Sequence, residues 1–415
     1  MFESSGEYYN FIDNNCDTTV VVFSSINVPR GKFSCSRAFD NKVYNYLFIN
    51  CPNNSWYLNN IFPNCYSFKE NCEYLKRFLV NKLGEEHKII TYGGSMGGYG
   101  ALVFGLAIKA DYVIATGVEH KLMIGGGNST RFLKAKINGL IPNVHDLLKD
   151  FNGRAFIIYG ENYMPDILCA FDLKDTQIEL VTLKNKPHSI PPYIESKFGL
   201  TNFISKTLDS DCLPFDSDEI GDILNSDSVP LLYEAFLEIK RKCFSQQKLD
   251  ELIECSNSCD SVSATAYCLL YIGIYFYENG KVEDAMRFLF KSRDLGLNNS
   301  EILSYIAYCY YDIGSYYKSS QFSKRAAYLS PLYSEKILMV HSRNLIKMGN
   351  VDDAVSFLNE FCPNSSGMVN YQLARCYYLL NDIDNALIYI KIAQDILPDR
   401  EDITDFVSKL EDLVS

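Results

Sequence analysis

One serine of this chain lies in a setting that suits nucleophilic chemistry. Residues 87–105, HKIITYGGSMGGYGALVFG, place Ser95 between pairs of glycines, after an apolar run and before a segment rich in small residues. A serine on a sharp turn between a strand and a helix projects its hydroxyl from the edge of the sheet. Glycines are needed beside it because a Cβ there would collide with the adjoining elements. The N–H groups at the start of the helix would then stabilise an oxyanion.

A serine nucleophile needs a histidine as its base and an acid to orient that base. The Gly-x-Ser-x-Gly segment resembles that of the α/β-hydrolases, and this resemblance implies the chain order serine, acid, histidine, with both partners downstream of Ser95. Of the five histidines, His188 follows the last predicted strand on a loop, so it is the candidate base. The acid should follow the preceding strand, and we favour Asp166, which would hold the imidazole in one tautomer and stabilise the imidazolium. Three other acidic residues remain candidates: Asp172, Glu161 and the more distant Asp175.

Stabilising the negative oxygen of a tetrahedral intermediate requires two N–H groups. We expect one from Met96, which directly follows the serine, and the other from the loop after the first strong strand, at Ser25 or Ile26. The same loop carries Arg30, with Lys32 and Arg37 close behind it. These cations could recognise an anionic group, such as a sugar carboxylate or a phosphate, or could simply be solvated surface charges.

The only tryptophan, Trp56, is followed by Tyr57 shortly after another predicted strand. Aromatic rings at that place could stack on a sugar or an acyl group. They could equally anchor the hydrophobic core, and the sequence leaves both interpretations open.

The elements that would position these residues alternate between strands and helices. Short β-branched or aromatic runs bounded by turn residues predict buried strands. They lie at 18–25, 44–51, 87–94, 111–118, 154–161 and 178–183. Residues 67–84 have apolar residues at helical spacing and end on Gly84, which predicts a helix with a glycine cap. This alternation predicts an α/β domain with a mostly parallel sheet and helices on both faces.

Strands disappear in the second half, where a repeat of about 34 residues begins. Its turn residues lie 34, 35 and 32 positions apart: Gly280, Gly314, Gly349 and Asn381. Small residues recur five positions after each turn, at Ala285, Ser319, Ala354 and Ala386. They also recur seven positions before it, at Gly273, Ala307, Ser342 and Ala374. The pattern resembles the tetratricopeptide repeat over residues 266–400, which implies pairs of antiparallel helices.

The change of pattern sets the predicted domain boundaries. We expect a catalytic domain at 1–208, an Asp- and Ser-rich linker at 209–230, and a helical repeat domain at 231–415. Within the last, residues 231–258 resemble an atypical leading helix pair and 401–414 a capping helix. Residues 119–148 are the candidate for a small lid over the site.

The Gly-Gly-Ser-Met-Gly-Gly-Tyr-Gly segment at 93–100, with its strand and helix, resembles the α/β-hydrolase family over roughly residues 18–200. It is similar to a bacterial branch that includes esterases and capsule O-acetyltransferases. The resemblance implies an acyl-enzyme on Ser95, and then either ester hydrolysis or O-acetyl transfer on a glycan-type substrate. Capsule acetyltransferases use acetyl-CoA, which makes it a candidate donor substrate; no bound cofactor and no metal are expected.

Composition narrows the range of partners. The net charge of −12 argues against nucleic acid and against a polybasic membrane surface. No apolar run is long enough for a transmembrane helix, and residues 1–17 lack the basic and apolar regions of a signal peptide, so we expect a cytoplasmic protein. The fourteen cysteines are scattered without Cys-x-x-Cys pairs, which argues against a disulfide framework or a zinc site.

Three functions fit these features. The first is a serine-dependent acyl-transfer enzyme whose repeats bind a protein, peptide or polymer in a groove. The second is a repeat scaffold whose hydrolase-like domain is inactive. The third is a serine peptidase, which the absence of a large cap neither favours nor excludes. The oligomeric state is not predicted.

Overall fold

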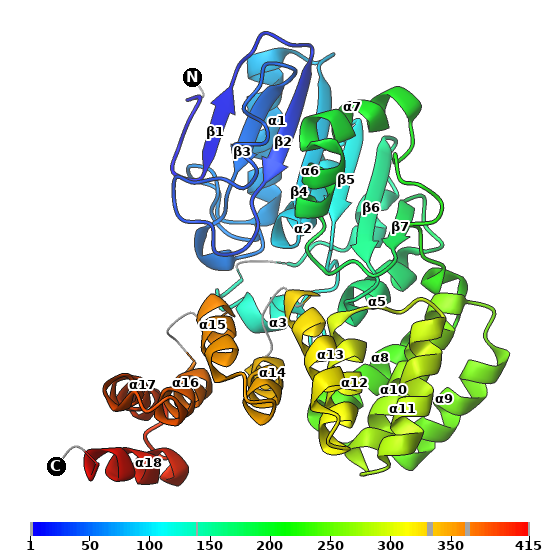
Figure 1. The fold of residues 1–415 in the computed structure, drawn as a ribbon. Coiled ribbons are helices and arrows are strands. Elements are labelled where there is room, and N and C mark those ends of the chain that lie inside the picture. Colours follow the sequence, from blue (N-terminus) through cyan, green and yellow to red (C-terminus); the bar gives the residue numbers. More distant parts are fainter. Residues whose placement is uncertain (1–2, 138–139, 330–334, 362–365, 414–415) are drawn as a thin grey trace. The chain divides into compact units, whose positions relative to one another are not determined.

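The chain folds into two compact units, shown together in a computed structural model (Figure 1). The structure describes residues 3–137, 140–329, 335–361 and 366–413. The first unit comprises Met1–Lys248 and Ser258–Ala264, and the second comprises Leu249–Asn257 and Thr265–Ser415. The first unit therefore includes the whole predicted linker and extends well beyond residue 208.

The first unit is built on a seven-stranded sheet with the order β1-β3-β2-β4-β5-β6-β7. The strands are β1 (Tyr9–Ile12), β2 (Thr18–Phe23), β3 (Asn45–Ile49), β4 (Lys88–Gly94), β5 (Tyr112–Thr116), β6 (Arg154–Gly160) and β7 (Glu179–Leu183). All neighbouring strands are parallel except β1, which pairs antiparallel with β3 at the edge. The six predicted strands are confirmed, whereas β1 was not predicted.

Helices connect the strands of this unit. They are α1 (Phe68–Leu83), α2 (Met96–Ile108), α3 (Asn128–Phe132), α4 (Val144–Leu148), α5 (Met164–Leu173), α6 (Pro191–Phe198), α7 (Leu200–Ser210) and α8 (Val229–Arg241). Short 3-10 turns lie at Pro52–Asn54 and Ile223–Asn225. The predicted helix at 67–84 is confirmed as α1: the Ser67 side chain accepts from the Glu70 amide, and Gly84 ends the helix with a positive φ of 92°.

Both faces of the sheet are covered by helices. Ile90 of β4 belongs to a hydrophobic cluster that includes Ile194 of α6 and Phe203 of α7. In Figure 1, α6 and α7 lie on the viewer's side of the strands. The next residue, Thr91, faces the other way and donates its hydroxyl hydrogen to the carbonyl of Ala101 in α2. Because side chains alternate along a strand, α2 must cover the opposite face.

The second unit consists of helices in sequential pairs, as the repeat pattern predicts. They are α9 (Gln246–Ser258), α10 (Val262–Glu278), α11 (Val282–Asp294), α12 (Ser300–Asp312), α13 (Tyr316–Leu329), α14 (Glu335–Lys347), α15 (Val351–Phe361), α16 (Gly367–Leu379), α17 (Ile383–Ile396) and α18 (Glu401–Glu411). The predicted capping helix at 401–414 corresponds to α18.

The predicted turn residues adopt the left-handed backbone that a tight helix–helix connection requires. Gly280, Gly314 and Gly349 have φ values of 74°, 76° and 83°, and Asn381 has a φ of 59°. These turns follow α10, α12, α14 and α16, so each lies between the two helices of one repeat.

The predicted small residues lie where the helices of a repeat approach each other. The Ser319 hydroxyl on α13 donates to the carbonyl of Ala307 on α12, at 2.7 Å, and both residues are fully buried. A Cβ added to Gly273 on α10 would lie 2.8 Å from Cγ of Leu289 on α11. Larger side chains at these positions would force the paired helices apart.

The helix pair predicted at 231–258 is present, but its two helices are divided between the compact units. Residues 231–258 do form two helices, α8 and α9, but α8 belongs to the first unit and most of α9 to the second. Helix α8 packs on the loop after β5 through an apolar contact and a hydrogen bond. A Cβ on Gly126 would lie 2.7 Å from the ring of Phe236, and Tyr233 donates its hydroxyl hydrogen to the carbonyl of Gly125. The apolar face of α8 thus covers the loop after β5.

Two expectations from composition can be compared with the structure. None of the cysteines among the described residues forms a disulfide. Among those same residues, the helices are either too short or too polar to cross a membrane.

Candidate active site

Ser95 occupies the turn between β4 and α2 in a backbone conformation that is rare for residues with a side chain. Its φ is 58° and its ψ is −123°, and its N–H donates to the carbonyl of Thr116 on β5 at 2.8 Å. A Cβ on Gly97 would lie 2.2 Å from the carbonyl oxygen of Phe23, and one on Gly93 would lie 2.2 Å from that of Gly97. The flanking glycines are therefore required for steric reasons.

A chain of hydrogen bonds links Ser95, His188 and Asp166. The Ser95 Oγ lies 2.8 Å from Nε2 of His188, and the other ring nitrogen, Nδ1, lies 2.8 Å from Oδ2 of Asp166. His188 is on the loop after β7, as predicted, and Asp166 is in the first turn of α5. Ser95 and His188 are partly exposed, whereas Asp166 is fully buried. The serine can therefore reach a substrate while the acid stays shielded from water.

Burial and neighbouring charges raise the pKa values of both Asp166 and His188. Burial raises the pKa of the Asp166 carboxyl to about 6, against the opposing pull of the His188 imidazole. Burial by itself disfavours the imidazolium, but the Asp166 carboxylate outweighs it and raises the pKa of His188 above its ordinary value. This pair is thus arranged to accept a proton at the imidazole and to stabilise the resulting charge.

Two neighbours of the base were missed by sequence reasoning. The ring of Tyr163 lies 4.9 Å from that of His188, and its hydroxyl donates to the carbonyl of Gly126 at 3.0 Å. Glu119 is buried and accepts from the amide of Ser129 at the start of α3, at 2.8 Å. Its charge raises the pKa of both His188 and Asp166. The sequence did offer a signal for Glu119, since it is an acidic residue just beyond the carboxyl end of β5.

The candidate oxyanion donors differ in availability. The amide of Ser25 donates to the Ser34 hydroxyl at 3.0 Å, so this N–H is already used. Hydrogen bonds from the Ile26 and Met96 amides to other described residues are not seen. Met96 begins α2 directly after Ser95, so of the two predicted positions in the loop, Ile26 is the better partner for it.

The predicted substrate contacts do not come together at Ser95. Arg30 is exposed and pairs with Glu7 at 2.7 Å, and the neighbouring Lys32 and Arg37 are exposed as well. The burial of the two aromatic residues corrects the idea that they stack on a ligand: Trp56 and Tyr57 are 1% and 0% exposed.

Tyr57 is held by the core rather than by a ligand site. Its hydroxyl donates to the carbonyl of Ser24 at 2.5 Å, and its ring packs edge-on against Phe23 at 5.1 Å. The alternative interpretation, an anchor of the hydrophobic core, is the one that fits.

The other acidic candidates have different partners. Glu161 accepts from Thr182 and Ser263 at 3.1 and 3.0 Å, and Asp175 is an exposed residue beyond α5. Asp172 instead lies within hydrogen-bond distance of two other histidines, His120 and His145. This trio is the group of the described residues whose side chains are placed to share a metal ion.

The predicted lid contains two short helices, α3 and α4. Residues 138–139 of that segment lie outside the described residues. The carboxylate of Glu119 caps α3 at its first turn, which ties the beginning of this segment to the residues around the histidine base.

Comparison with known proteins gives no family for this chain. No protein-family model matches it, and no curated protein sequence does. Among solved structures it is similar to YrrB, described as a TPR protein with an unusual peptide-binding site, at 18% identity and a TM-score of 0.37. That match covers 44% of this chain and 92% of YrrB.

Two further similarities have the same character. A tetratricopeptide repeat protein from Parabacteroides merdae is 13% identical with a TM-score of 0.37, over 44% of this chain and 71% of the other. MamA from Desulfovibrio magneticus is 16% identical with a TM-score of 0.32, and the match covers 35% of this chain and 82% of MamA. The tetratricopeptide-like description of the second unit rests on its own helix pairs, left-handed turns and buried small residues.

Proposed function

We propose that the chain is a serine-dependent acyl-transfer enzyme of the α/β-hydrolase type, with Ser95 as nucleophile, His188 as base and Asp166 as orienting acid. The observation that carries this proposal is the unbroken set of two 2.8 Å hydrogen bonds that joins the three side chains. A parallel sheet with the serine on a strained turn between β4 and α2 supports it.

The reaction would begin with attack of the Ser95 hydroxyl oxygen on an acyl carbonyl. Nε2 of His188 accepts the hydroxyl proton as the new C–O bond forms, and Asp166 stabilises the imidazolium through Nδ1–H. The imidazolium then returns the proton to the leaving group as the tetrahedral intermediate collapses. The acyl-enzyme is resolved by water or by an acceptor hydroxyl, with His188 again as the base.

The negative oxygen of the intermediate would be held by backbone N–H groups. Met96 offers its amide at the start of α2, where the helix dipole also favours negative charge. Ile26 would offer the second amide, because that of Ser25 already donates to Ser34.

Ester hydrolysis and O-acetyl transfer are two outcomes of the same acyl-enzyme. For transfer, acetyl-CoA would be the donor and a glycan hydroxyl the acceptor. For hydrolysis, a glycan-type ester would supply the acyl group. Both follow from the resemblance of the Ser95 segment to capsule acetyltransferases and esterases.

The test is the intact mass of the full chain after exposure to a fluorophosphonate and, separately, to acetyl-CoA. We expect a single phosphonate adduct on the wild-type chain, and none on Ser95→Ala. Ser210→Ala, a change at an exposed serine outside the site, should keep the adduct. A stable acetyl adduct from the coenzyme favours transfer, and absence of both adducts on the folded wild-type chain would contradict the proposal.

A second candidate function concerns the helical repeats, which present a cavity of about 370 Å³. Its lining includes Tyr277 of α10, Tyr308 of α12 and Lys336 of α14, with Glu335 and Arg343 also on α14. The Lys336 ammonium lies 4.3 Å from the centre of the Tyr308 ring. Aromatic rings beside charges of both signs suit a peptide or protein segment with its own mixed charges, so the repeats would serve as a binding scaffold.

This scaffold function is tested by selecting peptides that bind the full chain and measuring their affinity for variants. Lys336→Glu should weaken the selected peptides at least tenfold, whereas Arg287→Glu, at a cation on α11 outside the cavity lining, should not. Binding that is indifferent to both changes would place the peptide site elsewhere. Peptide binding together with an unreactive Ser95 would favour a scaffold with an inactive catalytic unit.

A further inference from the structure

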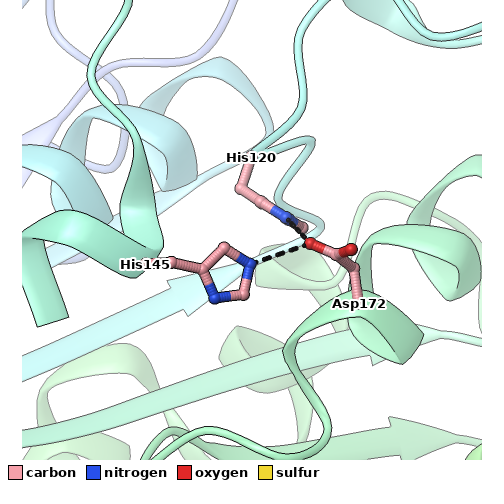
Figure 2. Close-up of side chains that lie close together, drawn as sticks. All are labelled: His120, His145 and Asp172. Atoms are coloured by element: carbon pink, nitrogen blue, oxygen red, sulfur yellow. Dashed lines mark hydrogen bonds and ion pairs between the residues drawn. The ribbon is translucent and has the colours of Figure 1, made fainter.

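Two imidazoles from different parts of the first unit converge on one carboxylate oxygen. The Nε2 atoms of His120 and His145 lie 2.9 and 3.0 Å from Oδ2 of Asp172. Figure 2 shows both imidazole rings turned toward that oxygen. The three ligand atoms all lie within 4.8 Å of one another.

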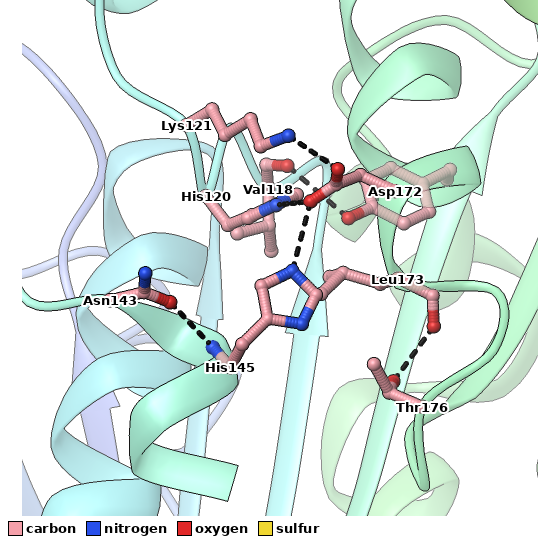
Figure 3. A network of polar contacts seen from close by, with 9 residues as sticks. Val118, His120, Lys121, Asn143, His145, Asp172, Leu173 and Thr176 are labelled. Atoms are coloured by element: carbon pink, nitrogen blue, oxygen red, sulfur yellow. Dashed lines mark hydrogen bonds and ion pairs between the residues drawn. The ribbon is translucent and has the colours of Figure 1, made fainter.

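The second oxygen of the same carboxylate is already occupied. Oδ1 of Asp172 accepts a hydrogen bond from the ammonium of Lys121, next to His120 in the chain (Figure 3). The carboxylate is therefore oriented with Oδ2 toward the two imidazoles. A hydrogen bond to the outer oxygen is a common way in which proteins orient a carboxylate ligand of a metal.

The other ligands are also held in place by the fold. His120 follows β5 and its side chain is 3% exposed. His145 lies in the first turn of α4, and its backbone N–H donates to the Asn143 side chain at 2.9 Å (Figure 3). Its side chain is 45% exposed, whereas that of Asp172 is 28% exposed. The cluster is thus closed on the His120 side and open to solvent on the His145 side.

We propose that His120, His145 and Asp172 form a binding site for one divalent transition-metal ion, with zinc as the expected ion. Two imidazole nitrogens and one carboxylate oxygen are ligands that zinc favours, and three protein ligands leave a fourth tetrahedral position for water. The solvent-open side at His145 is where that water would enter. The proposal does not depend on the catalytic role of Ser95.

Two of the three distances between the ligand atoms are close to those around such an ion, and the two imidazole nitrogens lie no more than 4.8 Å apart. Zinc bonds of about 2.0–2.1 Å place neighbouring tetrahedral ligands roughly 3.4 Å apart. The two nitrogen–oxygen distances of 2.9 and 3.0 Å would need to widen by about half an ångström or less to admit the ion. Rotation of the partly exposed His145 ring can widen one of these two distances, and a small shift of the Asp172 side chain can widen the other.

One feature limits the expected affinity. Nδ1 of His120 is buried and has no hydrogen-bond partner among the described residues. Zinc-binding imidazoles usually donate their second N–H to a carbonyl or carboxylate, and loss of such a partner weakens metal binding about 10–100-fold. We therefore expect an affinity below that of a fully supported three-ligand site.

Occupation of this site would join three segments that are far apart in sequence. His120 comes from the loop after β5, His145 from α4 and Asp172 from the end of α5. The first two belong to the predicted lid, residues 119–148, and the third shares α5 with Asp166. The ion would therefore fix the lid to the helix that carries the orienting acid.

The test uses the full chain, freed of metal with a chelator and titrated with zinc by calorimetry and thermal unfolding. We expect one zinc ion per chain and an unfolding midpoint that rises with zinc concentration, because the ion binds the folded state. His145→Ala and Asp172→Asn should each lower the affinity by more than the ~10–100-fold that a lost second-shell partner costs. Since His145 is exposed, its replacement should leave the fold intact.

Two controls keep the result interpretable. His87→Ala should bind zinc normally because His87, which directly precedes β4, contacts Thr19 on β2, away from the cluster. Ser95→Ala should bind it normally too, which separates this proposal from the catalytic one. Cobalt in place of zinc should give the visible absorption of a tetrahedral nitrogen and oxygen site without thiolate bands. The proposal would be overturned if the wild-type chain did not bind one zinc ion. It would also be overturned if His145→Ala and Asp172→Asn bound zinc as tightly as the wild-type chain.

Discussion

The most demanding test of the catalytic proposal is Asp166→Asn, because this change alters one atom and leaves the shape of the side chain nearly the same. Asp166 is fully buried, and its Oδ2 lies 2.8 Å from Nδ1 of His188. The other oxygen, Oδ1, is buried without a partner among the described residues. An amide at this position therefore has only two orientations, and both harm the base.

In the first orientation the amide NH₂ faces Nδ1, so Nδ1 must accept and the proton moves to Nε2. The imidazole then points an N–H at Ser95 and can no longer take its proton. In the second orientation the amide oxygen accepts from Nδ1–H, but the NH₂ is buried without an acceptor, which costs about 1–3 kcal/mol. That orientation also removes the charge that stabilises the imidazolium.

The expected loss is large in either case. Removing the charge of the orienting acid in a serine–histidine–aspartate site lowers kcat roughly 10⁴-fold, which is about 5 kcal/mol of transition-state stabilisation. We expect a loss of this order in the rate of phosphonate labelling of Ser95, followed by intact mass. Hydrolysis of an activated acetate ester gives a second, independent rate.

Asp175→Asn is the matched control, since it makes the same change at an exposed aspartate beyond α5. Its labelling rate should equal that of the wild-type chain. A rate for Asp166→Asn within tenfold of wild type would refute the role assigned to Asp166, provided that the variant is folded by circular dichroism. A larger loss in Glu161→Gln than in Asp166→Asn would do the same.

Three further outcomes are expected. Glu119→Gln removes a charge that raises the pKa of His188, so the imidazole stays neutral to lower pH. The acidic limb of the kcat/KM profile should therefore move to lower pH, and a limb that does not move would contradict this role of Glu119. Gly97→Ala would bring a Cβ within 2.2 Å of a carbonyl oxygen of β2, so labelling should be lost and urea stability should fall by at least the ~1–3 kcal/mol of an overpacked core. Gly273→Val would place its Cβ 2.8 Å from Cγ of Leu289. It should therefore lower the free energy of unfolding of the repeats in urea by about 1–3 kcal/mol, while the labelling of Ser95 stays unchanged.

Local chemistry made much of the fold predictable. Six strands are runs of β-branched and aromatic residues bounded by turns, and such runs are buried on both faces of a parallel sheet. The missed strand, β1, is a short edge strand, YNFI, whose pairing with β3 depends on a neighbour that is remote in sequence. The repeat unit was visible because its turns need left-handed residues and its paired helices need small ones.

The candidate site was predictable in proportion to how local its signals are. Ser95 is marked by the glycines beside it in the sequence, although the atoms that exclude a Cβ at Gly97 belong to β2. The choice among acidic residues was left open, because Asp166 and Asp172 lie on the same helix and the histidines that each one meets come from remote parts of the chain. Trp56 and Tyr57 were ambiguous since aromatic residues serve both core and ligand.

The sequence by itself determined the alternation of strands and helices, the strained serine turn and the period of the repeats, because these depend on residues within a few positions of one another. The tertiary structure decided which residues that are remote in sequence come together in space. It brought His188 to Ser95, packed α8 on the first unit, and gathered His120, His145 and Asp172 across 52 positions of chain. Such contacts follow from the packing of whole elements on the sheet, which no local pattern of residues specifies.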